Sequence, residues 1–387
     1  MNLSTPLDKC LCCGGELVPL MDFGPMPLVN TYSITERFPL AVNRCLKCCH
    51  VQLSEAVDPL LLYSDYAYCS GTGRTAADFF KDFARTALSY VPKAQEVLDI
   101  ASNDGSQLDA FRAHGLNTYG VDPAENLAPI ARAKGHRIEI GLFEKSMIER
   151  NGPFDIITAQ NVVAHTHRPV EFLTKCAAIM HAGSRLFIAT SQANMVVNGE
   201  CDTIYHEHIS YFNSGSMTRL AERAGLKVLD IIMHDIHGTS YVFVLGLSGA
   251  PSPRVQYRTQ WERVVGISRP PIYRWWRKHV EHKIGMIRER IEGYAKEGYY
   301  MVGCGAAAKG ISILNMAGAK LDVIVDNTPT KWNKSTSGMQ ILPFDEVANL
   351  KAEKVLFVLL AWNVSRELRE NILKLRNQPQ DVFVEVR

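Results

Sequence analysis

Short apolar runs separated by helical spacers dominate the chain from about Thr75 onward. Glu96–Ile100 and Asn117–Asp122 are predicted as buried strands, because each is a short apolar run bounded by turn residues. Gln107–His114 and Asn126–Lys134 follow them with helical character. This alternation predicts a mostly parallel, doubly wound sheet with helices on both faces, which is an α/β fold.

The same sheet is predicted to continue through four further strands. They are Phe154–Ala159, Arg185–Thr190, Val228–Met233 and Tyr241–Leu247. A parallel pair needs a long crossover connection, usually a helix. The last two runs have no helical spacer between them, so we expect an antiparallel edge there.

A second, smaller Rossmann-like α/β unit is predicted beyond a polar, aromatic stretch. That stretch, Arg254–Lys296, has the character of a long helix broken at Pro270-Pro271. The strands predicted after it are Tyr299–Gly303, Val323–Val325, Val355–Leu360 and Val382–Val386. The chain is therefore divided into an amino-terminal module at 1–68, the doubly wound domain at 69–250 and the smaller domain at 251–387.

Composition and charge set limits on the partners. The 387 residues are 47% apolar and 21% charged, as in an ordinary globular protein, and exceed what one hydrophobic core organises. A net charge of +2 offers no electrostatic footprint for nucleic acid or an anionic membrane, so we expect neither partner. No signal peptide is visible, and Val355–Trp362 is too short to span a bilayer, which favours a cytoplasmic protein. Nothing decides the oligomeric state, and a monomer is the default.

Six of the ten cysteines lie in the first fifty residues, a region too small to fold on a core alone. Cys10-Leu11-Cys12-Cys13 and Cys45-Leu46-Lys47-Cys48 form two C-x-x-C knuckles, whose thiolates can converge on one tetrahedral zinc. With all four positions filled by protein, such a zinc is structural. The predicted ligands are Cys10, Cys13, Cys45 and Cys48, with Cys12, Cys49 and His50 as rivals. The alternative is a set of buried or disulfide-bonded cysteines.

The turn after the first predicted strand is a candidate cofactor loop. Its small residues let the backbone approach a ligand, and Asp122 ends the next strand, where a carboxylate can accept hydrogen bonds from ribose hydroxyls. The Gly-x-Gly-x-x-Gly pattern is absent, so a ligand without phosphates, such as S-adenosylmethionine, fits better than a dinucleotide. An ordinary strand-to-helix turn is the alternative. The candidate cofactor residues are Asp99, Ser102, Asn103, Asp104, Gly105, Asp122 and Pro123.

The densest group of titratable side chains is Tyr205-His206-Glu207-His208. Histidine is basic near neutral pH, and a neighbouring carboxylate or phenol can orient its ring. The spacing is not the His-Glu-x-x-His of zinc proteases, so the group indicates a general base without a metal. A polar loop capping the sheet is the alternative. His165 is predicted at the carboxyl end of the sheet, where ligands of such folds bind.

Two further segments leave packing and binding open. The tyrosine segment with Tyr63, Tyr66 and Tyr68 is suited to packing between domains or to a lid over the cofactor. Gly303–Gly310, with Lys309, is a glycine-containing turn that opens a helix. That turn suits a phosphate cradle and structural helix packing equally well.

These motifs together resemble the S-adenosylmethionine-dependent C-methyltransferases that act on nucleotide-linked keto-sugars, over essentially the whole chain. The Tyr-His-Glu-His element is the most specific of them. Ala101 departs from the family, which usually has glycine there. The motifs are the doubled C-x-x-C, the tyrosine segment, Ser102-Asn103-Asp104-Gly105, Gly120-Val121-Asp122-Pro123, Tyr205-His206-Glu207-His208 and Gly303-Cys304-Gly305-Ala306-Ala307-Ala308-Lys309-Gly310, continuing to Asp326.

The resemblance implies methyl transfer to the carbon beside a ketone, usually C3 of a 4-keto-deoxysugar. It implies that His208 removes the C3 proton, that Tyr205 and Glu207 lie near the substrate, and that His165 assists. The smaller domain would help to hold the sugar nucleotide, with Tyr66, Gly305 and Lys309 as candidate contacts. S-adenosylmethionine and a structural zinc are the expected cofactors.

Three other functions compete with this interpretation. An RNA methyltransferase with a zinc-ribbon substrate module is one, although the near-neutral charge argues against it. A non-catalytic nucleotide-sugar binding protein that has kept the fold is another. The weakest is a pyridine-nucleotide oxidoreductase that uses the Gly303–Gly310 turn.

Overall fold

The computed structural model describes residues 3–32, 34–63, 74–143, 153–190, 194–234 and 240–386. These residues form two compact units. Unit 1 comprises Met1–Pro19, Asn43–Ala193 and Glu207–Ser268. Unit 2 comprises Leu20–Val42, Asn194–His206 and Arg269–Arg387.

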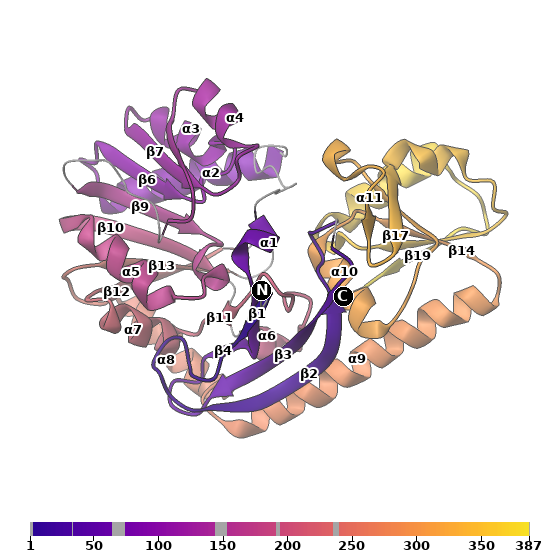
Figure 1. Cartoon of the computed structure of the whole chain (residues 1–387), viewed down its shortest axis with the longest axis horizontal. Helices are drawn as coiled ribbons and strands as arrows, with labels where there is room; N and C mark the ends of the chain where they lie inside the picture. Colours follow the sequence, from indigo (N-terminus) through magenta and orange to yellow (C-terminus); the bar gives the residue numbers. More distant parts are fainter. Residues whose placement is uncertain are drawn as a thin grey trace. The chain divides into compact units, whose positions relative to one another are not determined.

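Unit 1 is built on a seven-stranded sheet with the order β12-β13-β10-β9-β6-β7-β8 (Figure 1). Its strands from β10 to β8 are parallel, whereas β12 and β13 form an antiparallel edge. The predicted α/β class and the antiparallel edge are thus confirmed, and β8 is a strand that the sequence pattern did not predict. The strands are β6 Glu96–Ile100, β7 Asn117–Asp122, β8 Arg137–Ile140, β9 Phe154–Gln160, β10 Met180–Thr190, β12 Lys227–His234 and β13 Ser240–Gly246.

Both faces of this sheet are buried, because helices cover each of them. Val97 packs into a core with Phe83 of α2 and Phe111 of α3. The next residue, Leu98, points to the opposite face and joins a core with Phe172 of α5. The helices of unit 1 are α1 Pro59–Tyr63, α2 Arg74–Tyr90, α3 Ser106–Arg112, α4 Ala128–Ala133, α5 Pro169–Ala178, α7 Ser214–Arg223 and α8 Pro253–Val265, with the short 3-10 turn η2 Val163–His165.

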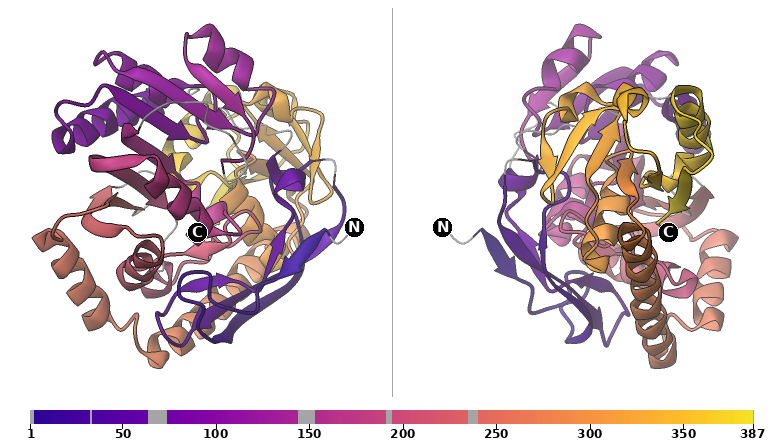
Figure 2. Two further views of the ribbon diagram at one scale, coloured as in Figure 1. Left: turned by 60° about the vertical axis from the view of Figure 1, so that its left-hand side comes forward. Right: turned by 90° about the vertical axis from the view of Figure 1, so that its right-hand side faces the viewer.

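The amino-terminal region contains long strands that the sequence pattern did not predict. β2 Leu17–Pro27 and β3 Arg37–Cys45 are neighbours in a four-stranded sheet with the order β11-β4-β3-β2 (Figure 2, indigo). The short strands β4 Val51–Leu53 and β11 Ser210–Tyr211 complete that sheet. Phe38, Leu40 and Val42 are buried alternately along β3, the period-two pattern of a strand covered on one face. The strands β1 Ser4–Pro6 and β5 Glu55–Val57 pair separately.

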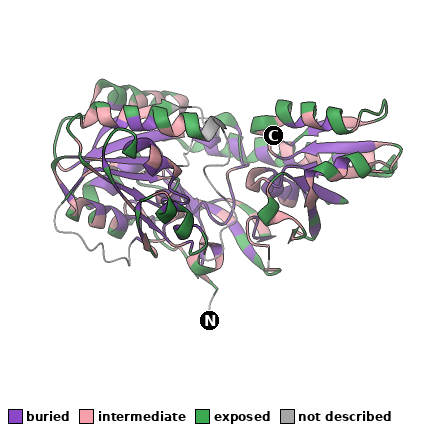
Figure 3. Cartoon of the chain, turned by 90° about the horizontal axis from the view of Figure 1, so that it is seen from above, coloured by how far each residue is buried: buried purple, intermediate pink, exposed green. Residues whose placement is uncertain are grey.

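Unit 2 contains a six-stranded sheet with the order β16-β17-β15-β14-β18-β19, parallel except for the β16–β17 pair. In Figure 3 its strands are buried, while its helices expose their outer faces. The predicted Rossmann-like unit is confirmed, with β16 and β17 in addition. Its elements are α6 Asn194–Asn198, α9 Pro270–Lys296, β14 Tyr300–Cys304, α10 Ala308–Ala317, β15 Val323–Asp326, η3 Pro329–Lys331, β16 Ser335–Thr336, β17 Met339–Pro343, η4 Phe344–Asn349, β18 Val355–Leu359, η5 Trp362–Val364, α11 Ser365–Leu375 and β19 Val382–Glu385.

The helical stretch predicted over Arg254–Lys296 is two helices. α8 ends at Val265 and is capped by Gly266, whose φ of 93° suits glycine, and α9 begins at Pro270. Proline fits the first turn of a helix, where its missing N–H would have no helical partner. Across the described residues, no helix combines the length and apolar character needed to cross a membrane.

Candidate active site and metal centre

The two cysteine knuckles converge in unit 1. The Sγ atoms of Cys10, Cys13, Cys45 and Cys48 all lie within 4.8 Å of one another. Cys10 Sγ is 3.6 Å from Cys48 Sγ, and Cys13 Sγ is 3.5 Å from Cys45 Sγ. A tetrahedral zinc with Zn–S bonds of about 2.3 Å places its sulfur ligands roughly 3.8 Å apart. The four thiols therefore fit a zinc ion that has no open coordination position.

The backbone around the knuckles favours this arrangement. The N–H groups of Lys47 and Cys48 point at Cys45 Sγ, at 3.3 and 3.5 Å. A Cβ at Gly15 would lie 3.2 Å from the sulfurs of both Cys13 and Cys45, so glycine eases the close approach of the first turn to the second. The N–H donors stabilise thiolate charge, which is the form that binds a metal.

Two of the rival ligands, Cys49 and His50, have other partners. Cys49 Sγ is 4.0 Å from Arg44 Nη1, and His50 Nε2 is 3.1 Å from Ser210 Oγ. Cys12 is fully buried. The four-cysteine group thus contains the same residues that the spacing of the two knuckles predicts.

The candidate cofactor loop lies at the carboxyl ends of β6 and β7. Asp99 accepts a hydrogen bond from Thr158 Oγ1 at 2.5 Å, and Asp122 accepts one from the N–H of Asn103 at 2.8 Å. Burial raises the pKa of Asp99 to about 7, against the opposing hydrogen bond from Thr158, and burial also raises the pKa of Asp122. Two buried carboxylates at one strand edge favour a ligand that carries hydroxyl groups and positive charge.

The backbone of this loop takes conformations that most residues avoid. Ala101 has a φ of 60° and Asn103 a φ of 50°, in the left-handed region. Ala101, which stands where the family has glycine, adopts the conformation that glycine favours. A Cβ at Gly105 would lie 2.7 Å from His136, and one at Gly120 would lie 2.4 Å from Ser102 Oγ. Within the described chain, Ser102 Oγ is buried without a hydrogen-bond partner, so it is available to a ligand.

The imidazoles of His165 and His208 meet in unit 1, although they are far apart in the sequence. Their ring centroids are 4.9 Å apart and the rings are perpendicular. Tyr63 Oη lies 2.9 Å from His165 Nδ1. Burial lowers the pKa of His165 to about 4, so this ring is neutral at pH 7. His208 is 8% exposed and Glu207 is 2% exposed.

A cleft of about 340 Å³ extends from Tyr63 to the end of β7. Its lining includes Pro123, which directly follows Asp122, together with Gly141 and Leu142. Tyr63 therefore connects the imidazole pair, through its hydroxyl, with the edge of the cofactor loop. The sequence around Tyr63 predicts a packing or lid role, and the contact of Tyr63 with His165 joins residues 102 apart in sequence.

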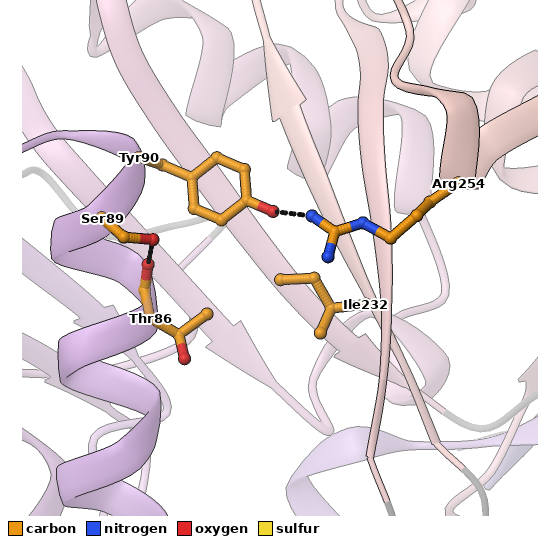
Figure 4. Close-up of a pocket in the computed structure, with 5 residues that line it drawn as sticks. All are labelled: Thr86, Ser89, Tyr90, Ile232 and Arg254. Carbon is orange, nitrogen blue, oxygen red and sulfur yellow. Dashed lines mark hydrogen bonds between the residues drawn. The ribbon is translucent and has the colours of Figure 1, made fainter.

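A second pocket, of about 400 Å³, has no part in this site (Figure 4). Thr86, Ser89, Tyr90, Ile232 and Arg254 line it, and Arg254 donates a hydrogen bond to Tyr90 Oη. The lining shares no residue with the cofactor loop or the imidazole pair.

That pocket adjoins a polar cluster, which we call the Asp230 clasp. Asp230 accepts hydrogen bonds from Tyr90 Oη at 2.5 Å, Ser252 Oγ at 2.7 Å and Arg254 Nε at 2.9 Å. The clasp thereby links α2, β12 and the beginning of α8.

The remaining predicted site residues lie in unit 2, except Tyr66, which falls outside the described residues. Tyr205 is 8% exposed. Lys309 Nζ is 3.8 Å from Asp202 Oδ2 and 5.2 Å from the centre of the Trp362 ring. Its neighbour Gly310 packs against the residue that follows β18, since a Cβ there would lie 2.4 Å from the backbone oxygen of Leu360.

In unit 2, His206 has a structural environment. Its Nε2 lies 3.1 Å from the carbonyl oxygen of Phe38, and its ring packs edge-on against the Phe38 ring. Of the two imidazoles in the Tyr-His-Glu-His element, His208 is therefore the one that faces another titratable ring.

Three families match consecutive parts of the chain. A zinc binding domain matches residues 10–63, a methyltransferase domain matches 72–231, and a C-methyltransferase C-terminal domain matches 235–386. The C-methyltransferase NovU of Streptomyces niveus is 27% identical over 96% of this chain and 93% of its own. The chain belongs to the S-adenosylmethionine-dependent C-methyltransferases.

This C-methyltransferase is also similar to proteins that match less than half of its chain. A ubiquinone biosynthesis O-methyltransferase of Coxiella burnetii is 26% identical over 36% of this chain and 66% of its own. Among solved structures, an S-adenosylmethionine-dependent methyltransferase from Clostridium acetobutylicum is 12% identical with a TM-score of 0.38, covering 45% of this chain and 92% of its own. The C-methyltransferase thus combines a cofactor-binding methyltransferase domain with a four-cysteine zinc-binding domain.

Proposed function

We propose that this C-methyltransferase methylates C3 of a nucleotide-linked 4-keto-deoxysugar, with His208 as the base. The observation that carries the proposal is the perpendicular pair of His165 and His208, joined through Tyr63 to the cleft beside the cofactor loop. A carbon next to a ketone becomes a nucleophile only after it loses a proton, so a base near the methyl donor is the chemical requirement.

His208 is proposed to take the C3 proton, which leaves an enolate whose negative charge rests largely on the ketone oxygen. His165 is the proposed partner for that oxygen. Its lowered pKa keeps the ring neutral, and a hydrogen bond from Tyr63 Oη to Nδ1 would place the ring proton on Nε2. A neutral N–H donor stabilises a developing oxyanion without giving up its proton.

S-adenosylmethionine supplies the activated methyl group. Asp122 and Ser102 are the proposed contacts for the nucleoside hydroxyls, because the carboxylate has further acceptor capacity and Ser102 Oγ is buried without a partner in the described chain. Asp99 is the proposed carboxylate near the positively charged part of this cofactor. Asn103, Asp104, Gly105 and Pro123 are proposed to shape the same loop.

The other predicted roles complete the proposal. Tyr205, Glu207 and Tyr66 are proposed to contact the sugar, and Gly305 with Lys309 the nucleotide diphosphate. The domains would be 1–68 for zinc, 69–250 for methyl transfer and 251–387 for the sugar nucleotide. Four reduced cysteines in one group suit the cytoplasm, where thiols are kept reduced.

The test is the variant His208→Asn, incubated with S-adenosylmethionine and a panel of nucleotide-linked 4-keto-deoxysugars in deuterated water. We expect the native enzyme to add one methyl group to carbon. The variant should bind the cofactor equally well and lose on the order of 10²–10⁴-fold in turnover, because proton abstraction is removed. Mass spectrometry measures the added methyl group in the product and deuterium incorporation at C3 in sugar that has not been methylated.

The control variant is His114→Asn, because His114 is exposed at the end of α3. It should keep full turnover. Weakened cofactor binding in His208→Asn would show that His208 is not the base. If the native enzyme binds the cofactor tightly but transfers no methyl group to any sugar, the substrate class is wrong and the RNA alternative is favoured.

A further inference from the structure

The segment that follows His208 is attached to the second zinc knuckle by a backbone ladder. Strand β11 pairs antiparallel with β4, with Ser210 opposite Gln52 and Tyr211 opposite Val51. The N–H of Leu53 donates to the carbonyl of Ile209 at 2.9 Å. Strand β4 begins shortly after Cys48. The residues that follow His208 therefore pair with the residues that follow the second zinc knuckle.

Asn213 adds a side-chain connection at the end of the same segment. Its Nδ2 donates to the carbonyl of Cys49 at 2.9 Å and approaches that of Cys48 at 3.4 Å. The residue is 3% exposed, so these bonds are shielded from water. Asn213 thus holds the backbone of the second knuckle five positions after His208.

The same side chain caps helix α7. Asn213 Oδ1 accepts the N–H of Ser216 at 2.7 Å, and Ser216 Oγ accepts the N–H of Asn213 at 3.0 Å. The buried carboxylate of Glu262 receives the N–H of Ser214 at 2.9 and 3.0 Å. The start of α7 is therefore fixed by α8, and the amide of Asn213 is the link from this fixed point to the knuckle.

We propose that Asn213 is a positioning residue that sets the place of the His208 imidazole, by clamping the segment 209–213 to the carbonyls of the second zinc knuckle. This inference rests on the proposed function of His208 as the base. His208 is packed between His165, at 4.9 Å, and Tyr211, at 6.4 Å between ring centroids. A movement of β11 would change both contacts, and a shift of about 1 Å at a reacting group can cost on the order of 10²-fold in rate.

The competing explanation is that Asn213 only caps helix α7 and has no role in placing His208. Two variants distinguish these explanations. Asn213→Ser keeps a good helix cap but is too short to reach the cysteine carbonyls. Asn213→Asp also keeps the cap acceptor, but it sets a carboxylate against two carbonyl oxygens. The matched control, Ser216→Ala, removes half of the capping box and leaves the clamp intact.

The experiment uses the full-length zinc-loaded protein, with S-adenosylmethionine and thymidine diphosphate-linked 4-keto-6-deoxyglucose as probes. For Asn213→Ser and Asn213→Asp we expect kcat to fall by about 10²-fold with little change in KM. The pH profile of kcat should shift, since His208 loses its present surroundings, while zinc content and cofactor affinity stay native. Ser216→Ala should lower Tm and leave kcat and its pH profile unchanged.

Native kcat and pH profile in both Asn213 variants would overturn the inference. So would an equal loss of kcat in Ser216→Ala, because capping alone would then explain the effect. If an Asn213 variant does not fold, Ser210→Ala, which removes the bond to His50 Nε2, must show the same pH-profile shift. His208→Asn, measured in parallel, separates the two claims. Full turnover in His208→Asn refutes the assignment of His208 as the base. Lost turnover in His208→Asn, together with unchanged kcat in the two Asn213 variants, refutes only the clamp.

Discussion

At the scale of single residues, the buried carboxylate of Asp99 in the cofactor loop lowers the stability of the cofactor-free protein at neutral pH. Burial raises its pKa from 3.8 to about 7, so the ionised carboxylate is disfavoured in the folded protein without its cofactor. A folded-state pKa above the unfolded value means that folding takes up a proton. Stability is therefore greatest below about pH 4 on this account, and it falls as the pH rises from about 4 to 7.

We predict that Asp99→Asn removes this pH dependence and stabilises the cofactor-free protein. The free energy of unfolding should rise by on the order of 4 kcal/mol above pH 7 and change little below pH 4, because the amide is neutral at every pH. Urea unfolding of both proteins between pH 4 and 8 measures the effect. The control is Asp155→Asn: burial opposes ionisation of Asp155, but backbone N–H groups and His181 outweigh it and lower its pKa. That variant should lose stability at neutral pH, and an identical response of the two variants would contradict the assignment.

At the scale of elements, the Asp230 clasp joins the first helix of the doubly wound domain to its edge strand. The side chain of Asp230 is 5% exposed, whereas that of Arg254 is 61% exposed. Burial would raise the pKa of Asp230, but the hydrogen bonds from Arg254, Ser252 and Tyr90 hold it at about 2. The clasp therefore contributes fully to the stability of the folded protein above about pH 4, and this contribution is lost as the pH falls towards 2.

We predict that Asp230→Asn lowers the free energy of unfolding by about 2 kcal/mol at pH 7, because hydrogen bonds to a charged acceptor are lost. The difference from the native protein should disappear near pH 2. Thermal unfolding across that pH range measures it. Glu222→Gln, which breaks the exposed pair with Arg219, is the control and should change stability little. Equal effects of the two variants would show that the clasp is an ordinary surface contact.

At the scale of the whole molecule, the four-cysteine group joins two knuckles of unit 1 that are far apart in the sequence. We predict that Cys45→Ser lowers the zinc content from about one ion per chain towards zero and lowers Tm with it, because metal binding supplies folding free energy. Cys49→Ser, whose thiol faces Arg44, should keep its zinc. Metal analysis and calorimetry on the same samples measure both. Full zinc occupancy in Cys45→Ser would move the ligand set to neighbouring residues.

Elements with a strong local signal can be predicted from the amino-acid sequence alone. β6 and β7 have the predicted bounds, because a buried parallel strand is a continuous apolar run between turns. The doubled C-x-x-C spacing named the four thiols that converge. β2 escaped prediction because its prolines and its glycine interrupt the strand pattern, and β3 is itself interrupted by Pro39. β8 and β16 are too short to show a pattern.

Which of these residues contact one another depends on the tertiary fold. His165 follows β9 and His208 precedes β11, so their perpendicular contact depends on how these two strands are placed in unit 1. The pairing of Tyr63 with His165 and of Asn213 with the cysteine carbonyls is equally non-local. Local sequence fixes backbone conformation through short-range sterics and hydrogen bonds. Contacts between distant side chains arise only when packing brings their elements together, and the proposed base and its clamp are contacts of that kind.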